Sequence, residues 1–181
     1  QEQLDAISKV ANGLVQQLRA QGITVKYDDR DTQKPGWKFN QYELQGVPLR
    51  IAIGPKDLEK GSVEMARRDT LTKQFVSQSD VANVVPELLD EIQNSLFDKA
   101  LKFREERTHV ANSWEEFERL IKESAGFVYA HWDGTTETED KIKNLTKATI
   151  RCIPLDNEQV EGKCILSGKP SNQRVVFAKA Y

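Results

Sequence analysis

Three turn signals divide the stretch from residue 35 to residue 56, and their spacing constrains the fold more than any other feature of the chain. Pro-Gly opens the stretch, Gly-Val-Pro interrupts it and Gly-Pro closes it. Such pairs mark turns because glycine tolerates positive φ and proline fixes φ. Only short elements fit between the breaks. The spacing therefore predicts a helix over residues 37–45 and a strand over residues 49–53.

Four side chains of this stretch suit the recognition of an unstacked nucleotide. In the predicted helix Phe39 and Glu43 lie one turn apart on the same face, and Arg50 and Lys56 stand at the start and just past the end of the strand. A ring can stack on a base, cations can bind phosphates or base oxygens, and a carboxylate can accept from base amino groups. The alternative is a core helix packed on a strand with its charges solvated. The residue chemistry alone favours that alternative, because aromatic clusters are usually buried.

Composition limits the classes of protein that remain. A chain of 181 residues makes one domain or two small ones, and two cysteines are too few for a disulfide framework. No apolar run is long enough to span a membrane, and no signal-peptide pattern opens the sequence. The net charge of −2 argues against a non-specific nucleic-acid binder. A local RNA site remains possible, because residues 26–73 carry ten Lys or Arg against eight Asp or Glu.

Several motifs point to one family. They are Tyr-Asp-Asp-Arg-Asp at 27–31, Pro-Gly-Trp-Lys-Phe at 35–39, Tyr-Glu-Leu-Gln-Gly-Val-Pro at 42–48, Gly-Pro-Lys-Asp-Leu-Glu at 54–59 and Ala-Arg-Arg-Asp-Thr at 66–70. Together they resemble the anticodon-binding domain of prolyl-tRNA synthetase, of the archaeal/eukaryote-like type that also occurs in some bacteria. Related synthetases for His, Gly and Thr share the domain type, but Lys-Phe-x-x-x-Glu-Leu-x-Gly-Val-Pro points to the proline enzyme. Segments 148–154 and 175–181 resemble the family's C-terminal extension, so the resemblance covers essentially the whole chain.

The resemblance implies an α/β fold in two parts. Residues 1–108 would form a mixed-sheet class II synthetase anticodon-binding domain, and residues 109–181 a small α+β extension domain. In the family an apolar strand precedes the first helix and lies in the middle of the sheet, whereas this sequence begins at Gln1, already on that helix. The catalytic domain is absent too. We therefore expect a C-terminal fragment whose sheet has an exposed edge or gap where the first strand belongs, which would favour association.

The resemblance also implies roles for single residues. It places base recognition on the four residues of the 35–56 stretch, with Lys38 and Arg68 as weaker candidates for phosphate contacts. Proline anticodons carry two guanines. Their N1–H and N2–H₂ groups suit the carboxylate of Glu43, and their O6 and N7 acceptors suit Arg50 or Lys56.

The partners and cofactors implied are those of the full-length enzyme. That enzyme would join proline to its tRNA with ATP and magnesium in the cytoplasm, as a homodimer. The present chain would bind the tRNA(Pro) anticodon and catalyse nothing itself. The terminal Tyr181 reaches toward the catalytic domain in the family and would lack that contact here. The rival hypothesis is a non-RNA α/β protein-interaction module, in which the Trp37–Lys56 surface docks a protein.

Many members of the family carry zinc in the C-terminal domain, and the four ligand positions fall on Asp133, Thr138, Cys164 and Ser167. Structural zinc needs about four nitrogen or sulfur donors in a tetrahedron, and only one thiol remains. We predict no zinc, with hydrogen bonds from Ser167 and Thr138 in its place. Cys164 and His131 could form the nucleophile–base pair of a thiol enzyme, but the order of the two residues in the sequence supports this only weakly.

Hydrophobic periodicity and turn chemistry predict the remaining elements. The three aspartates between residues 28 and 31 could be metal ligands, but turn formation explains them more simply. Helices are predicted over 2–20, from Pro86 to about 107, over 114–126 and over 137–146. Strands are predicted over 23–27, 62–70, 73–77, 127–132, 149–155 and 174–181.

Overall fold

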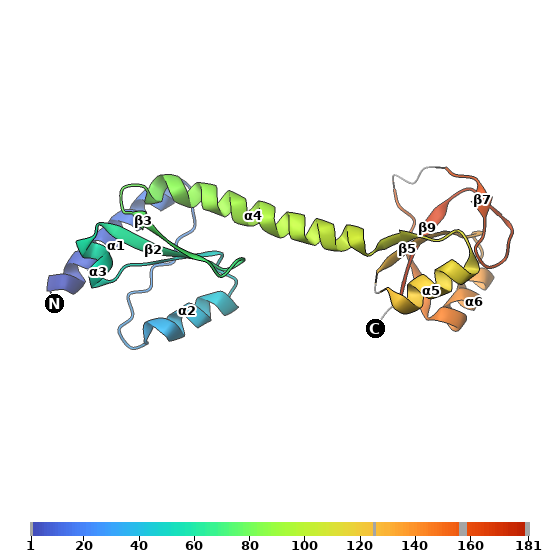
Figure 1. The fold of residues 1–181 in the computed structure, drawn as a ribbon, viewed down its shortest axis with the longest axis horizontal. Helices are drawn as coiled ribbons and strands as arrows, with labels where there is room; N and C mark the ends of the chain where they lie inside the picture. The colour runs from blue at the N-terminus through green and yellow to red at the C-terminus, as the bar shows by residue number, and fades with distance from the viewer. Residues whose placement is uncertain (1, 125, 156–158, 180–181) are drawn as a thin grey trace. The chain divides into compact units, whose positions relative to one another are not determined.

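The computed structural model describes residues 2–124, 126–155 and 159–179. The chain divides into two compact units, residues 1–98 and 99–181, and the division falls inside the long helix α4 (Val81–Glu106) (Figure 1). Each unit has its own hydrophobic core. The structure confirms the α/β class with a mixed sheet, which lies in the C-terminal unit. Tyr181 lies outside the described residues.

The N-terminal unit contains one antiparallel sheet and the helices around it. Its elements before α4 are α1 (Glu2–Ala20), α2 (Pro35–Leu44), β1 (Leu49–Ala52), α3 (Pro55–Glu59), β2 (Ser62–Arg67) and β3 (Lys73–Ser77). The strands pair in the order β1-β2-β3. The predicted helix and strand within residues 35–56 are therefore confirmed, with proline in the first turn of α2 and of α3, where its missing N–H costs nothing.

One face of this sheet is the core. Val63 and Met65 alternate along β2 and are fully buried. They pack against apolar residues of α1 and α4: Leu14, Leu18, Val81, Val85 and Leu88. Figure 1 shows α4 on one side of the sheet and α2 on the other.

The opposite face of the sheet carries polar and small residues in two rows. Strand register places Arg50, Ala66 and Lys73 in one row across the sheet, and Ala52, Glu64 and Phe75 in the next. Opposed residues of an antiparallel pair point to the same face, and both rows alternate with the buried Val63 and Met65. This open face, defined by the two rows, lies on the side of α2.

Residues 23–27 were predicted as a strand, and this prediction is wrong. Among the described residues the only main-chain hydrogen bond of this run joins Ile23 N–H to the Leu18 carbonyl, at 3.1 Å. A strand requires a neighbour whose backbone groups pair with its own, and apolar alternation does not supply one. Ile23 and Val25 nevertheless pack against the core. Within the described residues β1 and β3 are the two edge strands of this sheet.

Pro86 does not open a helix as predicted, because α4 already begins at Val81. The Asp80 carbonyl accepts from the Asn83 and Val84 N–H groups, at 3.0 and 2.9 Å, and so starts the helix one turn earlier. A proline inside a helix removes one main-chain bond. Here the burial of Val81 and Val85 on the core side accompanies the earlier start.

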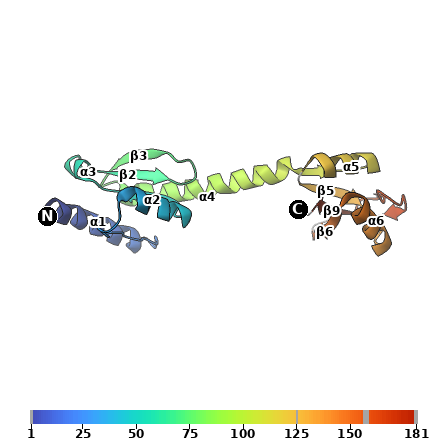
Figure 2. The same ribbon diagram turned by 90° about the horizontal axis from the view of Figure 1, so that it is seen from below.

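The C-terminal unit is a four-stranded mixed sheet with two helices. After α4 it contains β4 (Thr108–Val110), α5 (Trp114–Glu123), β5 (Phe127–His131), α6 (Thr136–Thr146), β6 (Ala148–Cys152), β7 (Gly162–Lys163), β8 (Pro170–Ser171) and β9 (Arg174–Lys179). The order is β4-β5-β9-β6, with β4 and β5 parallel and the other pairs antiparallel. Figure 2 shows β5, β9 and β6 following one another across the sheet.

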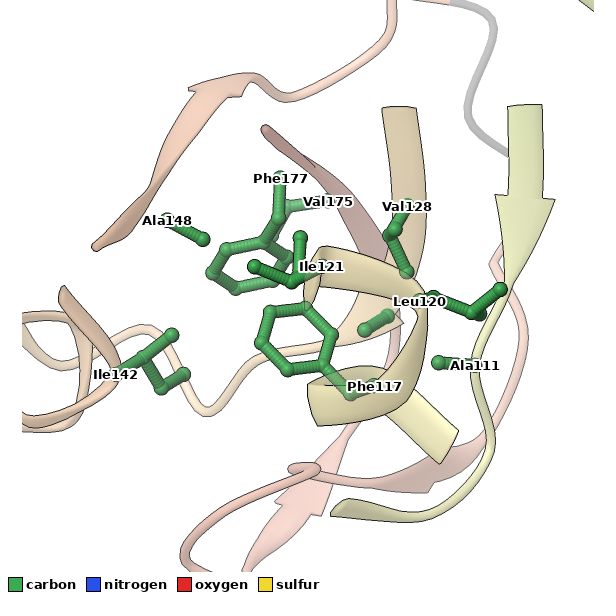
Figure 3. Close-up of a cluster of buried hydrophobic side chains, with 10 residues drawn as sticks. Ala111, Phe117, Leu120, Ile121, Val128, Ile142, Ala148, Val175 and Phe177 are labelled. Carbon is green, nitrogen blue, oxygen red and sulfur yellow. The ribbon is translucent and has the colours of Figure 1, made fainter. Parts of the chain in front are cut away.

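Two phenylalanines form the centre of this second core. Phe117 of α5 and Phe177 of β9 are fully buried, and their rings meet edge to face with centroids 5.1 Å apart (Figure 3). Trp114 stacks on Phe117 at 5.6 Å. The Ser113 hydroxyl caps α5 by accepting from the Glu116 N–H.

Candidate nucleic-acid interface

The centre of the candidate site is a cation–π pair between α2 and β1. The guanidinium carbon of Arg50 lies 3.4 Å from the centroid of the Phe39 ring. Arg50 Nη2 is also 3.8 Å from Glu64 Oε1 on the neighbouring strand. Arg50 Nη1 is buried and has no hydrogen-bond partner among the described residues. A buried donor without a partner costs free energy, so this nitrogen is an unfavourable feature of the protein in the absence of a ligand.

Glu43 lies one turn further along α2 and is exposed. Its carboxylate makes no hydrogen bond or ion pair with the part of the chain that the structure describes. Its backbone carbonyl accepts from Arg68 Nε at 2.8 Å, and the Arg68 N–H donates to the Pro48 carbonyl at 2.9 Å. Arg68 therefore ties the end of α2 to the sheet, which orients the Glu43 side chain. This contact uses Nε of the exposed Arg68 side chain, and the phosphate role expected for Arg68 stays a prediction.

Lys38 is likewise engaged within the protein. Its ammonium donates to the Arg30 carbonyl and lies 3.5 Å from Asp28 Oδ1. Asp28 also accepts from Arg30 Nε at 2.9 Å and from the Tyr42 hydroxyl at 3.0 Å. The hydrogen bonds from Arg30 hold the pKa of the Asp28 carboxyl well below its usual range. This network spans the aspartate-rich turn and ties it to α2 through Lys38 and Tyr42.

Lys56 stands at the second position of α3 and is exposed. The Gly54 N–H donates to Asp57 Oδ2 at 2.9 Å, which caps the helix and fixes the turn that carries the lysine. No hydrogen bond or ion pair joins the Lys56 side chain to any described residue. The structure thus brings Phe39, Arg50 and Glu43 to one end of the open face, and Lys56 follows on the next turn of chain.

Sequence reasoning missed Glu64 and Lys73, which complete the electrostatics of the face. Glu64 Oε1 is 3.1 Å from Lys73 Nζ as well as 3.8 Å from Arg50 Nη2. One carboxylate therefore holds two cations in place. The alternation of Val63 and Met65 already places Glu64 away from the core, but only the register of β1 with β2 brings it beside Arg50.

Three of the four family zinc positions, Asp133, Thr138 and Ser167, form a hydrogen-bonded cluster. Asp133 Oδ2 accepts from the Ser167 hydroxyl at 2.6 Å and the Thr138 hydroxyl at 2.9 Å, which confirms the expected hydrogen bonds. Cys164 is buried. Its N–H donates to the Lys169 carbonyl, and this hydrogen bond closes the turn over residues 164–169. One thiol with two hydroxyls and a carboxylate does not suit zinc, and no group of three or more His, Cys, Asp or Glu among the described residues could hold a metal ion.

The thiol-enzyme hypothesis fails on the same residues. Cys164 is only 3% exposed, so its thiol does not face a substrate. His131 is also buried, and its Nδ1 lies 3.2 Å from the Ser171 hydroxyl. Burial, followed by the positive charge of Arg174, lowers the pKa of His131, so the ring is neutral at pH 7. This pairing is typical of a packed histidine rather than a catalytic base.

The Asp133 cluster gives a prediction about stability. Burial raises the pKa of Asp133, but hydrogen bonds from Ser167, Thr135 and Thr138 outweigh it and lower the pKa to about 2. Asp133→Asn should therefore reduce the free energy of unfolding of the C-terminal unit by ~1–2 kcal/mol near pH 7. The folded pKa lies below the unfolded value of 3.8. The stabilisation is thus complete well above that value and is lost as the pH falls toward 2.

Urea unfolding between pH 7 and pH 3 checks this prediction. The difference between Asp133→Asn and the unmodified chain should shrink to roughly half at pH 3. Asp140→Asn, an exposed carboxylate on α6, is the control and should show no such trend. A difference that stays constant with pH would mean that the charge of Asp133 is not what the cluster stabilises.

Comparison with known proteins agrees with this geometry. The family model described as an anticodon binding domain matches residues 2–88, and the model described as the C-terminal domain of prolyl-tRNA synthetase matches residues 114–181. The chain is 62% identical over 181 residues to the proline–tRNA ligase of Christiangramia forsetii. It is 55% identical over 181 residues to that of Porphyromonas gingivalis, and 54% identical over 180 residues to that of Flavobacterium johnsoniae. These alignments cover 99–100% of this chain and 36–37% of the relatives.

The N-terminal unit, with Phe39, Arg50 and Glu43 at the open face of its sheet, is thus an anticodon-binding domain of the class II aminoacyl-tRNA synthetase type. The chain as a whole corresponds to the C-terminal region of the proline–tRNA ligases that it matches. It spans a little over a third of the length of the curated relatives that it matches. None of the helices within the described ranges has the length and apolar character needed to cross a membrane.

Proposed function

We propose that this chain recognises the anticodon of a proline tRNA. The observation that carries the proposal is the Phe39–Arg50 pair between α2 and β1, with the exposed Glu43 one turn further along α2. The match to the anticodon-binding family supports the same function. Phe39 offers a stacking surface, Arg50 donates to guanine O6 or N7, and Glu43 accepts from guanine N1–H and N2–H₂. Lys56 adds a second donor or a phosphate contact.

Within a full-length proline–tRNA ligase, the same region would hold the tRNA while a separate catalytic domain joins proline to it with ATP and magnesium. The proposal includes the cytoplasmic homodimer of that enzyme and a contact of Tyr181 with the catalytic domain. It also includes a domain boundary at residues 108 and 109, close to the end of α4. Lys38 and Arg68 would contribute to RNA binding mainly by fixing α2, given their contacts within the protein.

The test is binding of the 181-residue chain to the anticodon stem-loop of a proline tRNA and to the same stem-loop with both guanines replaced. Each specific hydrogen-bonding pair discriminates by ~1–3 kcal/mol, so replacing both guanines should weaken binding by about 30-fold or more. Glu43→Ala should lose most of this preference while retaining weak binding to both. Glu87→Ala, an exposed carboxylate on α4, is the matched control and should keep the preference.

Salt dependence separates this proposal from the protein-interaction module. RNA binding should weaken steeply between low and moderate salt, because each phosphate contact releases counterions. Equal binding of both stem-loops, or a uniform loss in Glu43→Ala regardless of sequence, would contradict anticodon recognition. Absence of RNA binding at low salt would favour the docking of a protein on the Trp37–Lys56 surface.

A further inference from the structure

An exposed aromatic ring on the open face has no role in the site described so far. Phe75 of β3 is 67% exposed, although large aromatic side chains are usually buried. Register pairs it directly with Glu64, the carboxylate that holds Arg50 and Lys73. Phe75 therefore belongs to the same face as the Phe39–Arg50 pair, and it lies on the far strand of the three.

The residues between the two rings leave the face open. Ala66 stands between Arg50 and Lys73 in one row, and Ala52 ends the other row opposite Glu64. Alanine side chains rise little above a sheet, so they do not fill the space above it. Neighbouring strands are about 4.8 Å apart, so the outer strands β1 and β3 lie roughly 10 Å from one another. A single-stranded segment can follow such a surface while its bases stack on side chains at both ends.

The charges of the face fit an RNA strand. Lys73 lies two residues from Phe75 on the same face of β3, and its side chain is more than half exposed. Together with Arg50 it gives the two rows of the sheet two cations and one carboxylate, Glu64. An exposed aromatic interleaved with cations on a sheet is the arrangement by which sheet proteins bind unpaired nucleotides.

We propose that Phe75 is a second stacking position, which binds the base of an unpaired nucleotide next to the anticodon guanines, while Lys73 contacts a neighbouring phosphate. This inference rests on the proposed anticodon recognition and extends it across the sheet. The ligand is a single-stranded nucleotide of the anticodon loop, held by stacking and therefore with little preference for one base. The site would add affinity, whereas Glu43 and Arg50 add specificity.

Substitutions at Phe75 test the stacking. The 181-residue chain is titrated with a fluorescently labelled anticodon stem-loop of a proline tRNA. Phe75→Ala should weaken binding by about tenfold or more, Phe75→Leu by a similar factor, and Phe75→Tyr should restore it because the ring is retained. Phe97→Ala is the matched control, since Phe97 is an exposed phenylalanine of α4, and it should bind like the unmodified chain. Circular dichroism should show that all four variants are folded, as expected for exposed positions.

A second readout identifies the base that stacks. 2-Aminopurine is placed at each loop position outside the two guanines, and its fluorescence is quenched on stacking. One position should be quenched by the unmodified chain and by Phe75→Tyr, but recover in Phe75→Ala. For the phosphate contact, Lys73→Gln should reduce the slope of log affinity against log salt by about 0.7.

The outcomes distinguish this inference from the function on which it rests. If Phe75→Ala binds like the unmodified chain while guanine replacement still weakens binding, the second stacking position is wrong and anticodon recognition stands. If Phe75→Leu keeps full affinity, the contact is apolar packing and not base stacking. If the unmodified chain shows no dependence on the guanines, anticodon recognition fails and the inference falls with it. An unchanged salt slope in Lys73→Gln would remove the phosphate contact.

Discussion

Replacing Phe177 with alanine should destabilise the C-terminal unit by about 3–5 kcal/mol, the largest effect on stability that we expect from a single change in this chain. Phe177 is fully buried on β9, the strand that pairs with both β5 and β6, and its ring meets Phe117 edge to face. Truncation would remove that contact and leave a cavity at the centre of the core (Figure 3). Domains are typically stable by only about 5–15 kcal/mol, so most of the stability of this unit would be lost.

Tryptophan fluorescence can report the C-terminal unit alone. The chain has three tryptophans, and only Trp37 belongs to the N-terminal unit. In a Trp37→Phe background, urea unfolding followed through Trp114 and Trp132 should show the Phe177→Ala midpoint shifted strongly downward. Phe127→Ala, at a partly exposed position on β5, is the control and should shift the midpoint much less. Equal shifts in both variants would mean that the Phe117–Phe177 contact does not organise this core.

Much of the fold was predictable because local patterns and packing agree. The helical spacing that ends at Leu18 predicts α1 closely, and the alternation of Val63 and Met65 identifies the buried face of β2. The prediction failed where an element depends on a distant backbone. Residues 23–27 have the pattern of a strand but pair with no strand among the described residues, although Ile23 and Val25 pack against the core. Periodicity reports which side chains prefer burial, and it does not report whether main-chain partners are present.

The candidate site was predictable to a similar degree. The spacing of Phe39 and Glu43 correctly placed them one turn apart on α2, and Arg50 begins the next strand closely enough to lie under the Phe39 ring. The internal contacts of Lys38 and Arg68 could not be foreseen, because they join residues 8 and 25 positions apart in the chain. The same holds for Glu64, whose position beside Arg50 follows from strand register.

Replacing Arg50 with alanine should weaken binding of the proline anticodon stem-loop by about 100-fold, close to 3 kcal/mol, the largest effect on function that we expect. The guanidinium of Arg50 stacks on the Phe39 ring, and its buried Nη1 has no hydrogen-bond partner among the described residues. Its loss would remove a direct contact to guanine, worth ~1–3 kcal/mol, and the support of the ring on which a base stacks. Arg50→Lys should recover only part of the affinity, because an ammonium lacks the planar fork that both stacks and donates twice.

The same variant should be nearly as stable as the unmodified chain, and this contrast is what identifies a binding residue. The substitution removes the cation–π contact, which lowers the free energy of unfolding. It also removes a buried nitrogen that has no hydrogen-bond partner in the described part of the chain, which raises the free energy of unfolding and opposes the first effect. In this variant Glu64 keeps Lys73 as an ion-pair partner, so its carboxylate is not left without a cation. Stem-loop titration and urea unfolding are measured on the same preparation, with Arg104→Ala, an exposed arginine of α4, as the charge-matched control. A loss of stability in proportion to the loss of binding would make Arg50 a structural residue. Weak binding by a stable Arg50→Ala protein would show that the guanidinium acts in RNA binding.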